Sequence, residues 1–188
     1  MSELIVYGGA FNPPTKGHFK IIEYLVNKFP NKKIIILPTN NFYKSKEIVS
    51  YEHRKNMLQL MCCDLLDKIE ISDYEQTLDK YMGTYYTLEH FNHPYFVIGA
   101  DSLETLYKWI NYPSVVIDNK YIVFPRGDIG IQEVINNNDV LSKYKENFII
   151  CDDFIENNIS STDYRVNKNE SIISENVLKY IKENSLYK

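Results

Sequence analysis

Short runs of β-branched and aromatic residues alternate along the whole chain with longer stretches of helical periodicity. This alternation is typical of βαβ units, in which helices connect the parallel strands of one sheet. The sequence therefore predicts an α/β fold with a doubly wound parallel sheet and flanking helices. The expected strands are Leu4–Tyr7, Lys33–Leu37, Ile69–Ser72, Tyr95–Ile98, Tyr121–Phe124 and Asn147–Ile150.

Between these runs, apolar residues recur at helical spacing, most clearly over Gly17–Phe29 and Glu52–Asp64. No internal repeat, low-complexity tract or break in composition separates a second domain. A chain of 188 residues with 44% hydrophobic content can bury one sizeable core, so residues 1–188 are expected to form a single domain. Further helices are expected at Tyr85–His93, Ser102–Trp109, Ile131–Asn137 and Ser174–Glu183.

Charge and cysteine content exclude several classes of protein. The net charge of −4 does not favour a nucleic-acid partner, because duplex binding normally needs a clustered basic surface. Cys62, Cys63 and Cys151 are odd in number and lack metal-ligand spacing, which favours reduced thiols over disulfides or zinc. The chain has neither a signal-peptide pattern at its start nor an apolar run near the roughly 18 residues of a membrane span. We expect a cytoplasmic protein without membrane or nucleic-acid partners.

The segment Leu4–His18 has the layout of a phosphate-binding site. A strand runs into Gly8-Gly9, two prolines stiffen the turn that follows, and Gly17-His18 stand where the first helix begins. Glycine lets a backbone approach a ligand closely, and a helix start offers N–H donors and the positive end of a dipole. A histidine can add a directional donor or a charge. Taken alone, a glycine pair more often marks an ordinary turn, and His18 can be a simple helix cap.

Two later segments also combine a strand end or a helix start with polar groups. Gly99 and Asp101 follow the fourth expected strand, and Asp101 can either accept hydrogen bonds from a ribose or cap the next helix. Ser161, Thr162 and Arg165 lie at a further helix start, where they offer hydroxyl groups and a forked cation. Because strand ends meet where the order of a doubly wound sheet reverses, we expect these segments to converge on one cleft.

Together these segments resemble the signature motifs of the nucleotidyltransferase superfamily. The run Gly8–His18 is similar to the pattern GG-x-F-(D/N)-P-x-(H/T)-x-G-H, and Ile159–Arg165 is similar to Ile-Ser-x-Thr-x-x-Arg. With Val97–Ser102 and the following Trp109, the chain most resembles the bacterial nicotinate-nucleotide adenylyltransferases. This resemblance implies a Rossmann-like sheet. It extends to Pro38-Thr39-Asn40, Tyr51–Leu58 and Tyr180–Tyr187, and so spans most of the chain.

The resemblance also implies roles for individual residues. His18, Thr15 and Arg165 are expected to act on the reacting phosphates, with His18 stabilising the charge that builds at the α-phosphate. The C-terminal helical part, about residues 159–188, is expected to complete the ATP phosphate site. Mg²⁺ would arrive with ATP, because no protein ligands for a metal are evident. ATP contacts are expected at Gly8, Gly9, Ala10, Phe11, Gly99, Asp101, Ser161 and Thr162, and contacts to a pyridine mononucleotide at Asn40, Thr84, Trp109 and Lys44.

Several positions depart from the family pattern. Thr15 stands where most members of this branch carry a histidine, Asn12 where they carry an aspartate, and Ile110 where tyrosine is common. A threonine hydroxyl can bond a phosphate oxygen but cannot become a cation, so more of the charge stabilisation would fall on His18. Lys16 is either a helper or a solvated surface lysine. Arg54 and Lys55 have equal claims to a surface role and a site role, and the loop Phe42–Lys46 departs from the usual Pro-Pro-His-(Arg/Lys) pattern.

The implied reaction joins nicotinic acid mononucleotide to the AMP part of ATP and releases pyrophosphate. One alternative is an adenylyltransferase that acts on nicotinamide mononucleotide or on both forms, and phosphopantetheine adenylylation and cytidylyl transfer are more distant. A nucleotide-binding sensor with weakened catalysis is the alternative from another class, and Thr15 and Asn12 are the residues that favour it. The sequence leaves open both the choice between acid and amide and the formation of a homo-oligomer.

Overall fold

The computed structural model describes residues 3–42, 48–155 and 159–188. Within these ranges the strands form a six-stranded sheet in the order β3-β2-β1-β4-β5-β6. The pairs β2–β3, β1–β4, β4–β5 and β5–β6 are parallel. Strand order grows outward on both sides of β1, so the expected doubly wound, Rossmann-like α/β fold is confirmed. The strands are β1 (Leu4–Gly9), β2 (Lys33–Pro38), β3 (Ile69–Ile71), β4 (Tyr95–Gly99), β5 (Lys120–Phe124) and β6 (Phe148–Ile150).

Each stretch with clear helical periodicity contains a helix. The second expected helix ends early at Met61, and the stretch expected at Ser102–Trp109 divides into an α-helix and a 3₁₀ turn. The helices are α1 (Lys16–Lys28), α2 (Tyr51–Met61), α3 (Thr84–His90), α4 (Ala100–Thr105), α5 (Ser114–Ile117), α6 (Ile131–Asn136), α7 (Asp139–Lys143), α8 (Ser161–Asn167) and α9 (Glu175–Glu183). The 3₁₀ turns are Cys63–Leu65, Tyr74–Thr77, Leu106–Lys108, Lys145–Asn147 and Glu170–Ile172.

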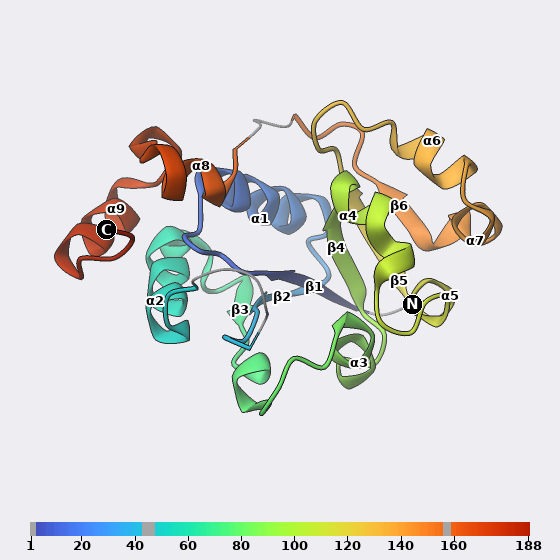
Figure 1. The fold of residues 1–188 in the computed structure, drawn as a ribbon, viewed down its shortest axis with the longest axis horizontal. Helices are drawn as coiled ribbons and strands as arrows, with labels where there is room; N and C mark the ends of the chain where they lie inside the picture. The colour runs from blue at the N-terminus through green and yellow to red at the C-terminus, as the bar shows by residue number, and fades with distance from the viewer. Residues whose placement is uncertain (1–2, 43–47, 156–158) are drawn as a thin grey trace. The chain divides into compact units, whose positions relative to one another are not determined.

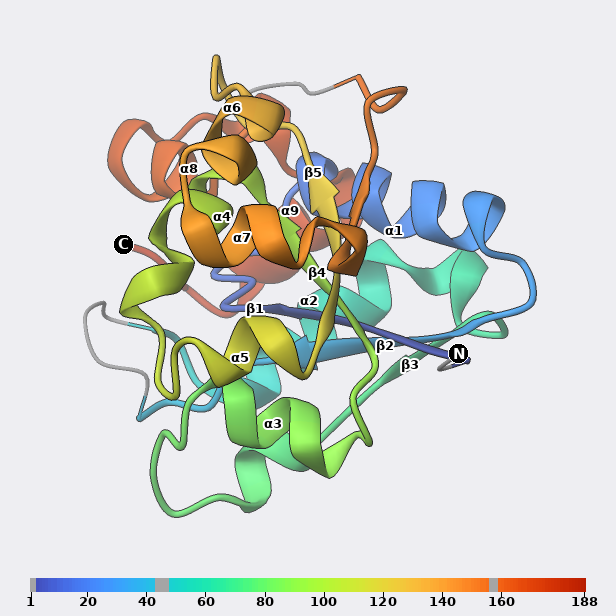
Figure 2. The same cartoon turned by 90° about the vertical axis from the view of Figure 1, so that its right-hand side faces the viewer.

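Residue contacts divide the chain into two compact units, which are described separately below. The first unit comprises residues 1–7 and 82–156, and the second comprises residues 8–81 and 157–188. In the first unit α4 packs against β4 and β5, and α6 lies beside both α4 and α7 (Figure 2). In the second unit α2 packs against β2 and β3, and α9 lies along α2 (Figure 1). The single-domain organisation stays a prediction.

The strands supply a large share of the core, because their side chains are covered on both faces of the sheet. Residues 34–38 of β2 are all buried, and residues 121–124 of β5 are at most 2% exposed. Strands of this kind are nearly continuous apolar runs, as expected for a parallel sheet. Each fully buried Ile, Leu or Val contributes roughly 1.5–3 kcal/mol relative to exposure. In the described part of the chain, no helix is long and apolar enough to cross a membrane.

Candidate functional site

The turn that follows β1 is built around the ring of Phe11. This residue is 1% exposed and has a φ of 47°, in the left-handed region that aromatic residues adopt only when their surroundings hold them there. Its ring covers Gly9 so closely that an added Cβ at position 9 would lie 3.1 Å from Cζ of Phe11. A larger residue at position 9 would therefore have to displace the ring of Phe11, independently of any ligand.

Thr15 and His18 close the first turn of α1 as a reciprocal cap. The Thr15 N–H donates to Nδ1 of His18 at 3.0 Å, and the Thr15 Oγ1 lies 2.9 Å from the same nitrogen. The His18 N–H in turn donates to Thr15 Oγ1 at 3.5 Å. Because Nδ1 accepts a backbone hydrogen, the neutral imidazole carries its proton on Nε2. The edge-on contact between the rings of Phe11 and His18, with centroids 5.1 Å apart, also fixes the orientation of the imidazole.

Arg54 lies fully buried beneath the turn after β1. Its Nη1 donates to the carbonyl oxygen of Ala10 at 2.9 Å, and its Nη2 donates to the Thr39 carbonyl at 2.7 Å and to Asn41 Oδ1 at 2.8 Å. Its Nε donates to the Val49 carbonyl at 3.1 Å. Burial lowers the pKa of Arg54, but a guanidinium remains a cation in a protein. Of the two roles considered for Arg54, the surface role is wrong.

The sequence contains a signal that Arg54 is buried. Arg54 lies at helical spacing from Met57, Leu58 and Met61, all of which are buried on the inner face of α2. An arginine in line with such a face must find internal acceptors, because a buried charge without hydrogen bonds is strongly destabilising. Lys55, one residue further along, points elsewhere and forms an ion pair with Asp73 at 2.7 Å.

The start of α8 also lies on the turn after β1. The Ser161 hydroxyl donates to the Pro13 carbonyl at 2.8 Å, and Nη1 of Arg165 donates to the Asn12 carbonyl at 2.6 Å. Nη2 of Arg165 donates to Thr162 Oγ1 at 2.9 Å. The structure therefore brings the first and third sequence motifs together within the second unit. Together with Arg54, this places two guanidinium groups on the carbonyl side of the turn.

Asn12 connects the turn to two further parts of the second unit. Its side chain is 2% exposed, and its Oδ1 accepts from the Val49 N–H at 3.2 Å and from the Tyr187 hydroxyl at 2.8 Å. Burial raises the pKa of Tyr187, although the nearby Arg54 and Arg165 oppose this shift. The phenol is therefore a neutral donor at physiological pH. Tyr187 was not expected to have a role, since only the general resemblance of residues 180–187 included it.

Three further residues of the second unit were considered for contacts with the mononucleotide or a phosphate, namely Asn40, Lys44 and Lys16. Asn40 is 1% exposed and holds its own loop, with Oδ1 accepting from the Phe42 N–H at 3.1 Å and Nδ2 donating to the Lys80 carbonyl at 3.3 Å. Lys44 lies outside the described residues. The exposed Lys16 donates to the carbonyl oxygen of Ser171 at 2.7 Å.

The first unit contains the segment at the end of β4. Gly99 precedes α4, and an added Cβ at this position would lie 2.5 Å from Oδ1 of Asp101. The carboxylate of Asp101 thus folds back over Gly99, and a larger residue at position 99 would displace this carboxylate. The buried Tyr7 lies close enough to be influenced by Arg126 and Asp101, and its pKa is raised mainly by burial.

Thr84 and Trp109 also belong to the first unit. Thr84 begins α3 directly after Gly83, whose φ is 95° and where an added Cβ would lie 2.7 Å from Cδ1 of Ile110. Ile110, which stands where tyrosine is common, therefore packs beside Thr84 through this glycine. Trp109 is half-buried and meets the ring of Phe96 edge-on, with centroids 6.3 Å apart.

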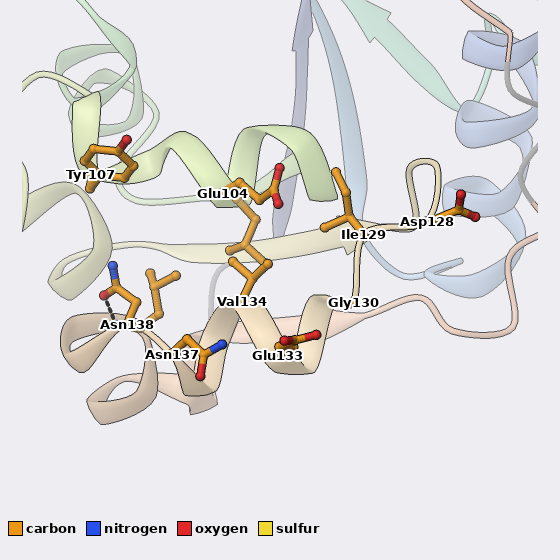
Figure 3. A pocket seen from close by; sticks show the side chains of 11 residues that line it. Glu104, Tyr107, Asp128, Ile129, Gly130, Glu133, Val134, Asn137 and Asn138 are labelled. Atoms are coloured by element: carbon orange, nitrogen blue, oxygen red, sulfur yellow. Dashed lines mark hydrogen bonds between the residues drawn. The ribbon is translucent and has the colours of Figure 1, made fainter.

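A pocket of about 540 Å³ lies elsewhere in the first unit, beside α4 and α6. Figure 3 shows the carboxylates of Glu104 and Glu133 above and below the aliphatic side chain of Val134, with Tyr107 at one end. None of the residues expected to bind a nucleotide lines this pocket. In the described part of the chain, no group of three or more His, Cys, Asp and Glu side chains is arranged to hold a metal ion.

Comparison with known proteins adds an independent line of observation. Residues 6–167 match the model of a family described as cytidylyltransferase-like. The chain is 37% identical to a probable nicotinate-nucleotide adenylyltransferase of Acholeplasma laidlawii, over 98% of this chain and 97% of that protein. It is 32% identical to a protein of the same name from Clostridium tetani, over the full length of both. The fold is similar to Plasmodium falciparum nicotinic acid mononucleotide adenylyltransferase complexed with NaAD, with a TM-score of 0.84, 21% identity and coverage of 100% of this chain and 98% of that chain.

Proposed function

Because this chain belongs to the cytidylyltransferase-like family, we propose that it transfers the AMP part of ATP to nicotinic acid mononucleotide, giving deamido-NAD and pyrophosphate. Full-length relatives named as probable nicotinate-nucleotide adenylyltransferases support this substrate pair over a cytidylyl transfer. The observation that carries the proposal is the turn after β1, where His18 is oriented by Thr15 and where Arg54 and Arg165 hold the backbone.

The orientation of the backbone suits an anion. Carbonyl oxygens of the turn are held by Arg54, Arg165 and Ser161, so they are directed at the protein. A carbonyl oxygen that faced a phosphate would repel it, whereas N–H groups and cations attract it. The donors on Arg54, Arg165 and Ser161 thus leave the N–H side of the turn as the side from which an anion can approach. The two guanidinium groups also place two positive charges close to the turn.

His18 is the residue that we assign to the transition state. The mononucleotide phosphate attacks the α-phosphorus of ATP in line, a new P–O bond forms, and the bond to pyrophosphate breaks with its electron pair. Negative charge builds on the oxygens of the α-phosphate during this step. Because Nδ1 of His18 accepts from the Thr15 N–H, the neutral ring carries its proton on Nε2, and we assign this N–H as the donor to these oxygens. No base is needed, because the attacking phosphate is already ionised near neutral pH.

Arg165 and Thr162 are assigned to the β- and γ-phosphates. A guanidinium carries five N–H groups, and the bonds of Arg165 to Asn12 and Thr162 use only part of them. Arg165 can thus support the turn and bind a phosphate at the same time. We treat Mg²⁺ as part of the substrate, because it would arrive with ATP and neutralise charge on the phosphates.

We assign Gly8, Gly9, Ala10, Phe11 and Ser161 to ATP on the basis of the motif. Asn40 supports the mononucleotide by holding the loop after β2, since both ends of its amide bond the backbone. In the first unit, Gly99 and Asp101 are assigned to ATP, and Thr84 and Trp109 to the mononucleotide. The cytoplasmic location stays a prediction of the sequence, and the formation of a homo-oligomer stays open.

The deciding experiment measures pyrophosphate release by the purified protein with Mg-ATP and either nicotinic acid mononucleotide or nicotinamide mononucleotide. We expect release with the acid form. A site that presents donors to a carboxylate should disfavour the amide by roughly 1–3 kcal/mol for each unpaired group, which is about 5-fold to 150-fold. CTP in place of ATP is the control for the nucleotide. Binding of ATP without release of pyrophosphate from either mononucleotide would instead support a nucleotide sensor.

A further inference from the structure

Residues 184–188, which follow α9, adopt a backbone that must be held in place by contacts. Ser185 and Tyr187 have φ values of 54° and 57°, in the left-handed region where a side chain crowds the backbone of non-glycine residues. The Leu186 N–H donates to the Ile181 carbonyl at 3.0 Å, which fastens this segment to α9. Within the second unit, this conformation directs the side chain of Tyr187 toward α8 and the turn after β1.

The ring and backbone of Tyr187 are fixed by α8 and its C-cap. Its ring meets the ring of Tyr164 edge-on, with centroids 5.9 Å apart, and its carbonyl oxygen accepts from Nζ of Lys168. Tyr164 is itself buried in α8, which begins with Ser161 and contains Arg165. The phenol is thus placed by the same helix that contacts the turn after β1.

The hydroxyl of Tyr187 reaches this turn at one atom, Oδ1 of Asn12. That oxygen also accepts from the Val49 N–H, while the Asn12 main-chain carbonyl accepts from Arg165. Asn12 is therefore held through its side chain by residues 49 and 187 and through its backbone by α8. Removing one of these donors leaves a buried acceptor with fewer partners and loosens the turn at its centre.

We propose that Tyr187 is a positioning residue for ATP binding: through its hydrogen bond to Asn12 it holds the turn after β1 in the form that accepts the nucleotide phosphates. The proposal rests on the proposed function in one respect, namely that this turn binds ATP. In this proposal Tyr187 contributes to ATP binding only through its hydrogen bond to Asn12, and this makes the proposal testable by coupling.

The test compares Tyr187→Phe with the matched control Tyr180→Phe. The Tyr180 hydroxyl bonds Nδ1 of His53 at 2.9 Å and Nδ2 of Asn56 at 3.0 Å, so its loss also weakens the docking of α9 but leaves Asn12 untouched. The dissociation constant of Mg-ATP is measured by calorimetry, without turnover. We expect Tyr187→Phe to weaken ATP binding on the order of tenfold, as for loss of a donor to a buried acceptor. Tyr180→Phe should change it less than about twofold.

A double-mutant cycle with Asn12→Ala shows whether Tyr187 acts through Asn12. Tyr187→Phe should have no further effect on ATP affinity once Asn12→Ala is present, because the acceptor is already gone. Three results would each overturn the proposal. These are equal losses of ATP affinity in Tyr187→Phe and Tyr180→Phe, additive losses of affinity in the cycle, or no ATP binding by the unmodified protein.

The proposed function is judged by a different readout, so the two failures are distinguishable. If the unmodified protein binds ATP but releases no pyrophosphate with either mononucleotide, the transfer reaction is wrong. The effect of Tyr187→Phe on the dissociation constant still decides the positioning role in that case. If transfer does occur, Tyr187→Phe should raise the KM for ATP more than it lowers kcat, because the hydrogen bond supports binding of the ground state.

Discussion

At the scale of single residues, His18 is both a helix cap and the donor assigned to the reacting phosphate. These roles reinforce one another, because the bond from the Thr15 N–H to Nδ1 keeps the proton of the neutral ring on Nε2. The replacement of the usual histidine by Thr15 also has a structural reason. Threonine is a favoured N-cap, and Thr15 is 1% exposed. We therefore expect Thr15 to act mainly by orienting His18.

Replacing His18 by alanine tests this assignment. His18→Ala should lower the rate of pyrophosphate release by about 10²-fold or more, since it removes a donor that acts on transition-state charge. The dissociation constant of ATP should change little. Lys16→Ala is the control, because its ammonium group bonds the Ser171 carbonyl and its removal should leave the rate nearly unchanged. An unchanged rate in His18→Ala would contradict the role of the imidazole.

Residues within contiguous motifs could be anticipated from the sequence, whereas residues joined across the chain could not. His18 and Arg165 were expected as functional groups because each stands in a recognisable spacing. Tyr187 and Asn12 are 175 positions apart in the sequence, and Arg54 and Ala10 are 44 positions apart. No local sequence pattern therefore shows these hydrogen bonds. Asn12 was noted only as a departure from the family pattern, and the sequence did not show that its Oδ1 accepts two hydrogen bonds from distant residues.

At the scale of elements, a small residue in α1 allows the segment before α8 to approach. An added Cβ at Gly17 would lie 3.3 Å from Cβ of Ile159, closer than an ordinary contact. Ile159 stands two residues before Ser161, whose hydroxyl bonds the Pro13 carbonyl. The glycine of the Gly-His pair is thus needed for packing between α1 and this segment, in addition to any contact with a ligand.

Gly17→Ala should lower the rate of turnover while changing the free energy of unfolding little. Alanine is favoured over glycine inside a helix by about 1 kcal/mol, and this offsets part of the cost of displacing Ile159. The free energy of unfolding should therefore fall by no more than that cost. Pyrophosphate release should fall on the order of tenfold, because the displaced segment carries Ser161 and Arg165. Adding Ile159→Gly removes the Cβ atom that the new methyl group would meet and should restore most of the rate. A double variant as slow as Gly17→Ala alone would argue against this mechanism.

Long apolar patterns made most elements predictable. Each expected strand is present, with ends shifted by a residue or two, because parallel strands buried on both faces are near-continuous apolar runs. The short helices α5 and α7 were not expected, since Ser114–Ile117 and Asp139–Lys143 are too brief to show a helical period. Asn138 was a usable signal for α7, because its side chain caps the first turn.

At the scale of the whole molecule, the alternation of strands and helices predicted the class of fold and its winding. The observed strand order is one of those that right-handed crossovers allow, and it places the phosphate motif after the strand where the order reverses. The network around the turn after β1 does not follow from such rules. It depends on side-chain bonds that form only once residues 8–81 and 157–188 are packed into one unit.

The dependence of unfolding on ATP tests the single-domain prediction. A ligand that binds only the folded state at 100 times its dissociation constant adds about 2.7 kcal/mol of stability. For a chain of 188 residues this raises Tm by about 5–11 °C, at about 2–4 °C per kcal/mol. If the chain unfolds as one domain, calorimetry should show one transition that moves as a whole with Mg-ATP. Two transitions, of which ATP moves only the one containing the turn after β1, would show instead that residues 8–81 and 157–188 unfold independently.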